Sequence, residues 1–253
     1  MTVRIGEVGL GPGRPRICVP LTAATVAGLE QEARVVGPEV ADLVELRIDR
    51  FAGVADLGAV ERAIALVRIA LDPGLPILLT CRTVHEGGGA DLLPDAYAAL
   101  VGLAARHSGV AAVDVEMERP AVAAAVGAVH EAGKPAVLSF HDLTATPPQE
   151  AIVERLVRQQ AMGADVVKLA CTPSEPADVL TLLAATAQYT ARPDARPAVT
   201  MAMGPLGVVS RIAGETFGSV LTFGTVGAPS APGQVDAARL RDALDLVHEA
   251  QQR

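Results

Sequence analysis

From residue 16 onward, short aliphatic segments alternate with segments whose apolar residues recur at helical spacing. The aliphatic segments are rich in valine, leucine and isoleucine, which is typical of strands buried on both faces. About eight of them alternate with about eight helical segments, without a break in composition. Such alternation favours parallel strands that close into a (β/α)8 barrel. We therefore predict an α/β fold in which residues 1–253 form a single TIM-barrel domain, with 1–14 as a short N-terminal extension.

The strands are predicted at the aliphatic segments and the helices between them. An open, doubly wound sheet is the alternative arrangement. No Gly-x-Gly-x-x-Gly motif follows the first strand, which weakens the dinucleotide-binding version of that alternative. The predicted strands are 16–21, 41–49, 76–82, 110–116, 136–141, 163–170, 197–203 and 219–223, and the predicted helices are 25–36, 57–71, 94–106, 120–132, 148–162, 176–189, 208–216 and 237–251.

Charge and composition argue against several classes of partner. A net charge of −8 and an aromatic content of 2% disfavour nucleic-acid binding, which uses basic surfaces and stacking platforms. No apolar segment approaches the length of a membrane span, and the first residues lack a signal-peptide block. Cys18, Cys81 and Cys171 are odd in number and widely spaced, so they suggest neither a disulfide framework nor a zinc site. We expect a protein of the reducing cytoplasm.

Charged or titratable side chains stand at the C-terminal ends of several predicted strands. In a barrel these ends converge on one mouth, where the active sites of this fold lie. We therefore predict a polar pocket that holds acids, bases and cations together. The residues concerned are Glu45 and Arg47, Arg82, Asp114, His141 and Lys168.

Lys168 is the most informative of these residues. It lies near the end of a valine-rich strand, where a lysine needs a partner, a water-filled cavity or a chemical role. A desolvated amine with a lowered pKa can attack a carbonyl and form an imine. The alternative is a lysine that extends from the strand end to solvent.

The other strand-end residues also have purely structural interpretations. Glu45 and Arg47 share one strand face and are compatible with an ion pair, while Asp49 is compatible with a cap at the strand end. Arg82 precedes a glycine-rich loop and is compatible with an ordinary surface arginine. His141 taken alone is compatible with a core histidine whose hydrogen bonds are satisfied.

Two kinds of chemistry are compatible with such a mouth. A divalent metal held by Glu45, Asp114 and Glu116 is conceivable, but a neighbouring lysine and two arginines oppose it electrostatically. A lysine that forms an imine, a histidine that moves protons and arginines that hold a carboxylate together indicate Schiff-base chemistry on a keto acid. The residues alone leave aldol cleavage, dehydration and isomerisation open.

Several motifs resemble those of the type I 3-dehydroquinate dehydratase family. The resemblance extends from about Arg16 to the C-terminus, and its C-terminal part is the most specific. The motifs are Glu45-Leu46-Arg47-Ile48-Asp49, Thr80-Cys81-Arg82 with Glu86-Gly87-Gly88, Ser139-Phe140-His141-Asp142, Asp165-Val166-Val167-Lys168, the segment 210–219, Thr222-Phe223-Gly224 and Ser230-Ala231-Pro232-Gly233-Gln234.

The resemblance implies syn elimination of water from 3-dehydroquinate, giving 3-dehydroshikimate in the shikimate pathway of aromatic amino acid biosynthesis. Lys168 would form the imine with the C3 ketone. His141 would take the C2 proton and protonate the departing C1 hydroxyl, while Glu86 orients its ring. The resemblance further implies that the substrate carboxylate is bound by Arg211, Ser230 and Gln234, and that the ring hydroxyls are contacted by Glu45, Arg47 and Arg82. It also implies apolar pocket walls at Met201, Met203 and Phe223, although these three residues are nearly as compatible with plain barrel core.

The resemblance also implies a homodimer and no metal or organic cofactor, because the lysine itself supplies the electron sink. The Gly/Pro/Ser-rich segment 227–234 is expected to act as a lid. Two positions depart from the family pattern. Pro20 stands where some members carry serine, and the segment 203–207 replaces a more polar linker.

Two rival functions share parts of this pattern. A class I aldolase on the same scaffold would use the lysine but has no evident use for Arg211, Ser230 and Gln234 together. A non-catalytic barrel that senses a cyclic carboxylate would keep the arginines, but it needs neither His141 nor Lys168.

Overall fold

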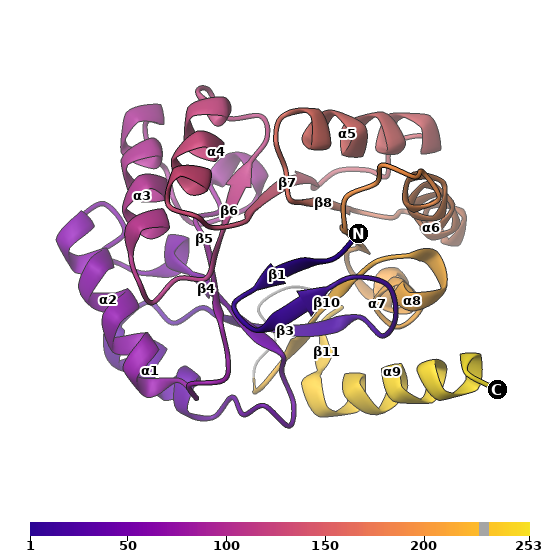
Figure 1. Cartoon of the computed structure of the whole chain (residues 1–253), viewed down its shortest axis with the longest axis horizontal. Coiled ribbons are helices and arrows are strands. Elements are labelled where there is room, and N and C mark those ends of the chain that lie inside the picture. The colour runs from indigo at the N-terminus through magenta and orange to yellow at the C-terminus, as the bar shows by residue number, and fades with distance from the viewer. Residues whose placement is uncertain (228–232) are drawn as a thin grey trace.

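The computed structural model describes residues 1–227 and 233–253. In it, strands β3 to β10 lie side by side in parallel, each next to its neighbour in the chain, with β10 beside β3 (Figure 1). A bridge between Ala198 and Ser219, with a hydrogen bond of 2.9 Å from the Val220 N–H to the Ala198 carbonyl, joins β9 to the segment that enters β10. The predicted α/β TIM barrel is therefore confirmed. The strand bounds are β3 Arg16–Leu21, β4 Leu43–Arg47, β5 Ile77–Thr80, β6 Ala112–Glu116, β7 Ala136–Asp142, β8 Val166–Cys171, β9 Ala198–Ala202 and β10 Leu221–Thr225, followed by the short β11 Val235–Asp236.

The helices surround the ring of strands (Figure 1). Local signals set several of their starts: Thr25 and Asp56 cap α1 and α2, and Glu175 forms a reciprocal capping box at the start of α6. In the part of the chain that the structure describes, none of the helices is long and apolar enough to cross a bilayer. The helices are α1 Val26–Arg34, α2 Leu57–Ala70, α3 Pro94–Arg106, α4 Val122–Glu131, α5 Gln149–Ala161, α6 Pro176–Thr190, α7 Val208–Ile212, α8 Gly214–Phe217 and α9 Ala237–Gln251, with 3-10 turns η1 Ile48–Arg50, η2 Val84–Glu86 and η3 Pro205–Gly207.

Several predicted bounds differ from the structure by one to three residues, and two of the predicted elements also change in character. The strand predicted at 41–49 is shorter, because the chain turns into η1 after Arg47 and places Asp49 within that turn. The helix predicted at 208–216 is divided into α7 and α8, since Ala213 leaves helical geometry between them.

The inward-facing positions of the barrel change from apolar to polar along several strands. Alternate residues of a strand point to the same side, so every second residue faces the interior. In β6 this series runs from Ala112 to Asp114 and Glu116, and in β8 from Val166 to Lys168. The apolar members at the N-terminal ends form one buried cluster. The polar members therefore share the C-terminal end of the barrel.

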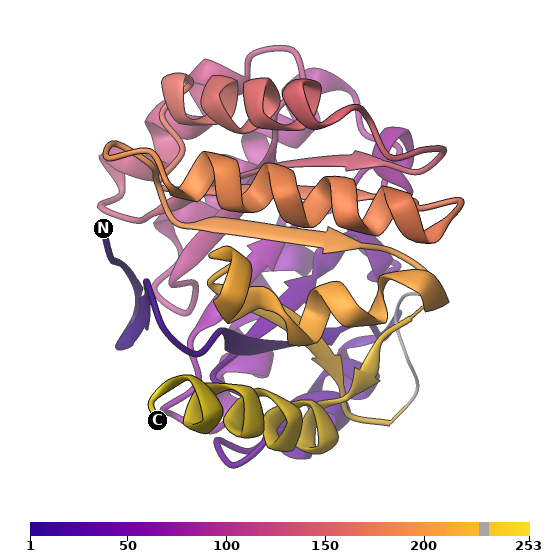
Figure 2. The same cartoon turned by 90° about the vertical axis from the view of Figure 1, so that its right-hand side faces the viewer.

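The first residues form an antiparallel hairpin of β1 (Val3–Ile5) and β2 (Val8–Leu10) that was predicted only as an extension. Ile5 and Leu10 are fully buried in the apolar cluster at the N-terminal ends of the strands. Figure 2 shows this hairpin at the left, at the opposite end of the barrel from the arrowheads of the strands. The hairpin therefore closes the end of the barrel that does not carry the polar residues.

This closure predicts a stability effect at Leu10. Leu10→Ala should lower the free energy of unfolding by about 2–5 kcal/mol, because it leaves a cavity where the hairpin meets the barrel. Leu10→Met should cost less than about 1.5 kcal/mol, since it conserves volume. Urea unfolding followed by circular dichroism measures both, and equal midpoints for Leu10→Ala and wild type would contradict this role.

Candidate active site

A cavity of about 220 Å³ opens at the C-terminal mouth of the barrel. It gathers residues from strands that are far apart in the sequence, as the prediction of a shared polar pocket required. The predicted residues that line it are Glu45, Arg47, Arg82, Glu86, His141, Lys168, Met201, Met203, Arg211, Phe223 and Gln234. Ser230 and most of the expected lid lie outside the described residues.

Lys168 projects from β8 into this cavity and is almost fully buried, with 3% exposure. Its Nζ lies 3.0 Å from Asp114 Oδ2 and 3.3 Å from Glu45 Oε1. The Phe223 ring lies beneath the ammonium, with its centroid 4.8 Å from Nζ. The lysine therefore does not extend to solvent, which rules out the structural alternative.

The two carboxylates reverse the pKa shift expected for this lysine. Burial by itself lowers the pKa of Lys168, but the nearby Asp114 and Glu45 charges outweigh it, so the net shift is upward. The expectation of a lowered pKa for Lys168 is therefore wrong. Two acids within hydrogen-bond reach stabilise the ammonium more than desolvation destabilises it.

Arg82 organises the acids around the lysine. Its guanidinium is 3% exposed and donates to Asp114 at 2.8 Å, Glu86 at 3.1 Å and Glu116 at 3.2 Å. It also donates to the Ser139 hydroxyl at 2.9 Å. Despite its burial, these acids raise the pKa of Arg82. The interpretation of Arg82 as a surface arginine is therefore wrong.

His141 and Glu86 form a hydrogen-bonded pair at one wall of the cavity. The distance from His141 Nδ1 to Glu86 Oε2 is 2.8 Å. Burial and then the positive charges of Arg82, Lys168 and Arg47 hold the pKa of His141 well below its usual value. Burial raises the pKa of Glu86 to about 8, with Glu116 and Asp114 opposing its ionisation against the pull of Arg82. The imidazole is therefore neutral near pH 7 and able to accept a proton.

Arg47 is paired with Asp49 rather than with Glu45. Its guanidinium donates to both oxygens of Asp49, at 2.8 and 2.9 Å. Asp49 also accepts from the Gly89 N–H at 3.0 Å, so it fixes the glycine-rich loop as well as the arginine. Glu45 instead accepts from the Thr80 hydroxyl at 2.8 Å. Both structural alternatives for this strand, a Glu45–Arg47 ion pair and an Asp49 that serves only as a cap, are wrong.

Arg211 is a buried cation without an acidic partner among the described residues. It is 2% exposed, and its closest hydrogen-bond acceptor is the Phe223 carbonyl at 3.5 Å from Nη1. Its Nε is buried without an acceptor in residues 1–227 and 233–253, and burial lowers the pKa of Arg211 to about 10. A buried guanidinium in this condition is strongly favoured to take up an anion from the cavity.

The apolar walls belong to both the cavity and the core. Met201 and Phe223 line the cavity and also pack in the apolar cluster inside the barrel, so their two interpretations are compatible. Four further lining residues were missed in the sequence: Arg50, Gly87, Leu143 and Ala170. Arg50 follows Asp49 in η1, and its position one turn beyond a strand end was the available signal.

The acids proposed as metal ligands already have partners. Glu45 and Asp114 bond to Lys168, and Glu116 accepts from Arg82 and from the Thr83 N–H and hydroxyl, each of the latter at 2.7 Å. Within residues 1–227 and 233–253, no group of histidine, cysteine or acidic residues is arranged to hold a metal ion. The geometry thus favours the lysine alternative over the metal alternative.

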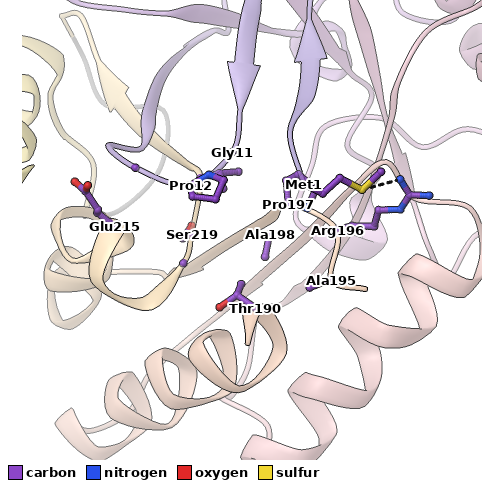
Figure 3. Close-up of a pocket in the computed structure, with 13 residues that line it drawn as sticks. Met1, Gly11, Pro12, Thr190, Ala195, Arg196, Pro197, Ala198, Glu215 and Ser219 are labelled. Carbon is purple, nitrogen blue, oxygen red and sulfur yellow. Dashed lines mark hydrogen bonds between the residues drawn. The ribbon is translucent and has the colours of Figure 1, made fainter. Parts of the chain in front are cut away.

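A second cavity, of about 260 Å³, lies near the N-terminal ends of β9 and β10 (Figure 3). Its charged residues Glu215 and Arg196 stand at opposite sides of it (Figure 3). Glu215 is bonded to His248 at 2.7 Å, and Arg196 donates to the Met1 sulfur at 3.2 Å. None of the strand-end polar residues reaches this cavity, so the candidate active site is the mouth at the other end.

Comparison with known proteins assigns the chain to a family. The family model of type I 3-dehydroquinase matches residues 17–251. The chain belongs to the type I 3-dehydroquinase family. This enzyme is therefore a hydro-lyase of the 3-dehydroquinate dehydratase class, as the motifs predicted.

The similarity extends over the full length of this enzyme. The 3-dehydroquinate dehydratases of Listeria welshimeri and Klebsiella pneumoniae are each 42% identical to it, over 98% and 97% of its chain and 98% of theirs. A type I 3-dehydroquinate dehydratase from Clostridium difficile, solved with covalently modified comenic acid, superposes with a TM-score of 0.93 at 35% identity, covering 98% of each chain.

The charges around His141 predict how it titrates. NMR of imidazole-labelled protein should show His141 neutral well below pH 6.5, because a proton on this ring would be desolvated and repelled by Arg82 and Lys168. Lys168→Met removes one of the positive charges and should raise the pKa of His141. Titration of His141 near pH 6.5 in wild type would contradict this electrostatic description.

Proposed function

We propose that the enzyme converts 3-dehydroquinate into 3-dehydroshikimate and water through an imine on Lys168, with His141 as the proton carrier. The observation that carries this proposal is the buried Lys168, which faces the same cavity as a neutral histidine and a guanidinium without an acidic partner among the described residues. These groups match a substrate that is both a ketone and a carboxylate.

Substrate binding is assigned to the cationic side of the cavity. Arg211 receives the substrate carboxylate, which supplies the anion that this buried guanidinium lacks among the described residues. Gln234 lines the cavity and assists it. Ser230 is assigned to the same carboxylate by the family resemblance alone. Glu45 accepts a hydrogen bond from a ring hydroxyl, and Arg47 donates one to a ring hydroxyl. Arg82 acts mainly by holding the acids in place.

Imine formation begins when Lys168 gives up a proton and its neutral amine attacks the C3 carbonyl carbon. The C3 oxygen leaves as water after taking up protons, and a C=N bond replaces the C=O bond. The resulting iminium carries a positive charge at the position of the former ammonium. Asp114 and Glu45 therefore stabilise the intermediate by the same contacts that raise the pKa of the lysine. The C. difficile relative, whose structure contains covalently modified comenic acid, is consistent with covalent chemistry at such a site.

His141 then moves one proton from carbon to oxygen. Glu86 holds Nδ1, so the other ring nitrogen is available to the substrate. That nitrogen takes the C2 proton, and the C–H electrons form an enamine by neutralising the iminium. The enamine electrons expel the C1 hydroxyl, which leaves as water with the proton returned by His141. Hydrolysis of the conjugated iminium by one water releases the product and regenerates the Lys168 amine.

The organisation of the enzyme in the cell is proposed on the resemblance alone. We assign it to a homodimer of single-domain chains that acts in the cytoplasm, in the shikimate pathway of aromatic amino acid biosynthesis. The proposed chemistry uses the lysine as the electron sink and so requires neither a metal nor an organic cofactor. Sedimentation velocity of the purified enzyme tests the dimer directly.

Borohydride trapping tests the role of Lys168. Protein incubated with 3-dehydroquinate and reduced with borohydride should gain the mass of one reduced adduct, because reduction converts the imine into a stable amine. Peptide mapping should place the adduct on Lys168, and Lys168→Met should show none. Product formation is followed in parallel by the enone absorbance of 3-dehydroshikimate. Enone formation without an adduct at Lys168 would refute the imine while leaving the dehydratase activity intact.

Replacement of Arg211 tests the carboxylate site. Arg211→Met should raise the KM for 3-dehydroquinate about 10- to 100-fold, because a charge-assisted hydrogen bond contributes about 1.5–3 kcal/mol. The matched control is Arg192→Met, since Arg192 is partly exposed and pairs with Asp194 away from the cavity. Steady-state kinetics of both variants should separate them clearly. An Arg211→Met enzyme with the KM of wild type would contradict the assignment.

A further inference from the structure

Gln159 makes an unusual contact with the backbone of Lys168. It lies on α5, outside the ring of strands, and its side chain is fully buried. Its Oε1 accepts from the Lys168 N–H at 3.0 Å, and its Nε2 donates to the Lys168 carbonyl at 2.9 Å. The same Nε2 also lies 3.5 Å from the Met117 sulfur. One side-chain amide thus bonds both backbone groups of the lysine.

This contact ties the position of the lysine to helix α5. A carboxamide presents a donor and an acceptor side by side, as a peptide group does, so it can pair with a residue much as a neighbouring strand would. In most of a parallel sheet, backbone groups find their partners in the adjacent strands. At Lys168 the helix also supplies one donor and one acceptor. The backbone from which Nζ projects is therefore held from outside the barrel.

The two acids that face Nζ are held by other residues. Asp114 is fixed by Arg82 and Ser139, and Glu45 is fixed by Thr80. Gln159 shares no hydrogen bond with any of these groups in the described part of the chain. A change at Gln159 should therefore displace the amine while leaving the acids in place.

We infer that Gln159 is a positioning residue for the reaction, which holds the backbone of Lys168 so that its amine meets both the acids and the substrate ketone. This inference rests on the proposed imine at Lys168. A displacement of about 1 Å at a reacting group can reduce a rate about 100-fold, so the effect should appear in the chemical step.

A pair of adjacent glutamines provides the experiment. Gln159→Met removes the bonds to Lys168, whereas Gln160→Met makes the same chemical change one residue along α5. Gln160 bonds to the Tyr189 hydroxyl at 2.8 Å and to the Asp194 carbonyl at 3.0 Å, away from the lysine. Rapid mixing with 3-dehydroquinate, followed by a borohydride quench, measures the rate of imine formation in each variant.

Gln159→Met should form the imine about 10- to 100-fold more slowly than wild type, and Gln160→Met should stay within about threefold. Quinate carries a hydroxyl in place of the C3 ketone, so it binds without forming an imine. Its affinity should be unchanged in both variants, because the carboxylate site at Arg211 is untouched. Equal imine rates in the two variants, with similar losses of thermal stability, would reduce Gln159 to a structural role and overturn the inference.

Gln159→Glu adds a readout that a purely structural role would not move. An ionised glutamate accepts from the Lys168 N–H but cannot donate to the Lys168 carbonyl, whereas the protonated acid can do both. Burial raises the pKa of such a carboxyl, so its imine rate relative to wild type should recover as the pH falls. A ratio independent of pH would contradict the inference. Absence of any adduct in wild type is a distinct outcome, because it refutes the proposed role of Lys168 itself and this inference with it.

Discussion

The structure of the active site depends on Asp114, a buried carboxylate shared by two cations. One of its oxygens accepts from Lys168 at 3.0 Å, and the other accepts from Arg82 at 2.8 Å and from the Ser139 hydroxyl at 2.6 Å. Burial alone would raise the pKa of this acid, but Arg82 and Lys168 outweigh it and lower the pKa. Asp114 is therefore charged, and it sets the distance between the amine and the guanidinium that gathers the other acids.

Such a network fixes positions more than it adds stability. Each buried charge loses its hydration, and the attraction between partners often does no more than offset that loss. The stability of the barrel must come from elsewhere. The large apolar cluster between the strands and the surrounding helices is the main source, and the apolar interior at the N-terminal ends of the strands adds to it. The β1–β2 hairpin completes that interior with Ile5 and Leu10. Inside the barrel, apolar packing therefore occupies the N-terminal end and the polar network occupies the C-terminal end.

The raised pKa of Lys168 has a direct consequence for the proposed mechanism. A lysine with a low pKa would be ready to attack but would leave the iminium with little stabilisation. Here Asp114 and Glu45 favour a positive charge at Nζ. In the proposed mechanism the iminium carries that charge before the C2 proton is removed and again after the C1 hydroxyl has left. The neutral His141 complements this arrangement. Burial and the surrounding cations keep its ring unprotonated, so the ring is available to accept a proton from the substrate. Gln159, bonded to both backbone groups of Lys168, is the residue that we propose positions the amine between the acids and the ketone.

The sequence by itself determined the barrel and most members of the site. The alternation of aliphatic strands and helices specifies parallel pairing, and a titratable residue at the end of a buried strand is conspicuous because burial there is costly. Tertiary structure alone decided the partners: Arg47 bonds to Asp49, Arg82 to three acids, and Gln159 to the backbone of Lys168. Tertiary structure also decided that the pKa of Lys168 is raised and that the β1–β2 hairpin closes the N-terminal end of the barrel. These outcomes depend on distances between side chains that are remote in sequence. Electrostatic energies change steeply with distance and burial, and the local order of residues does not encode either quantity.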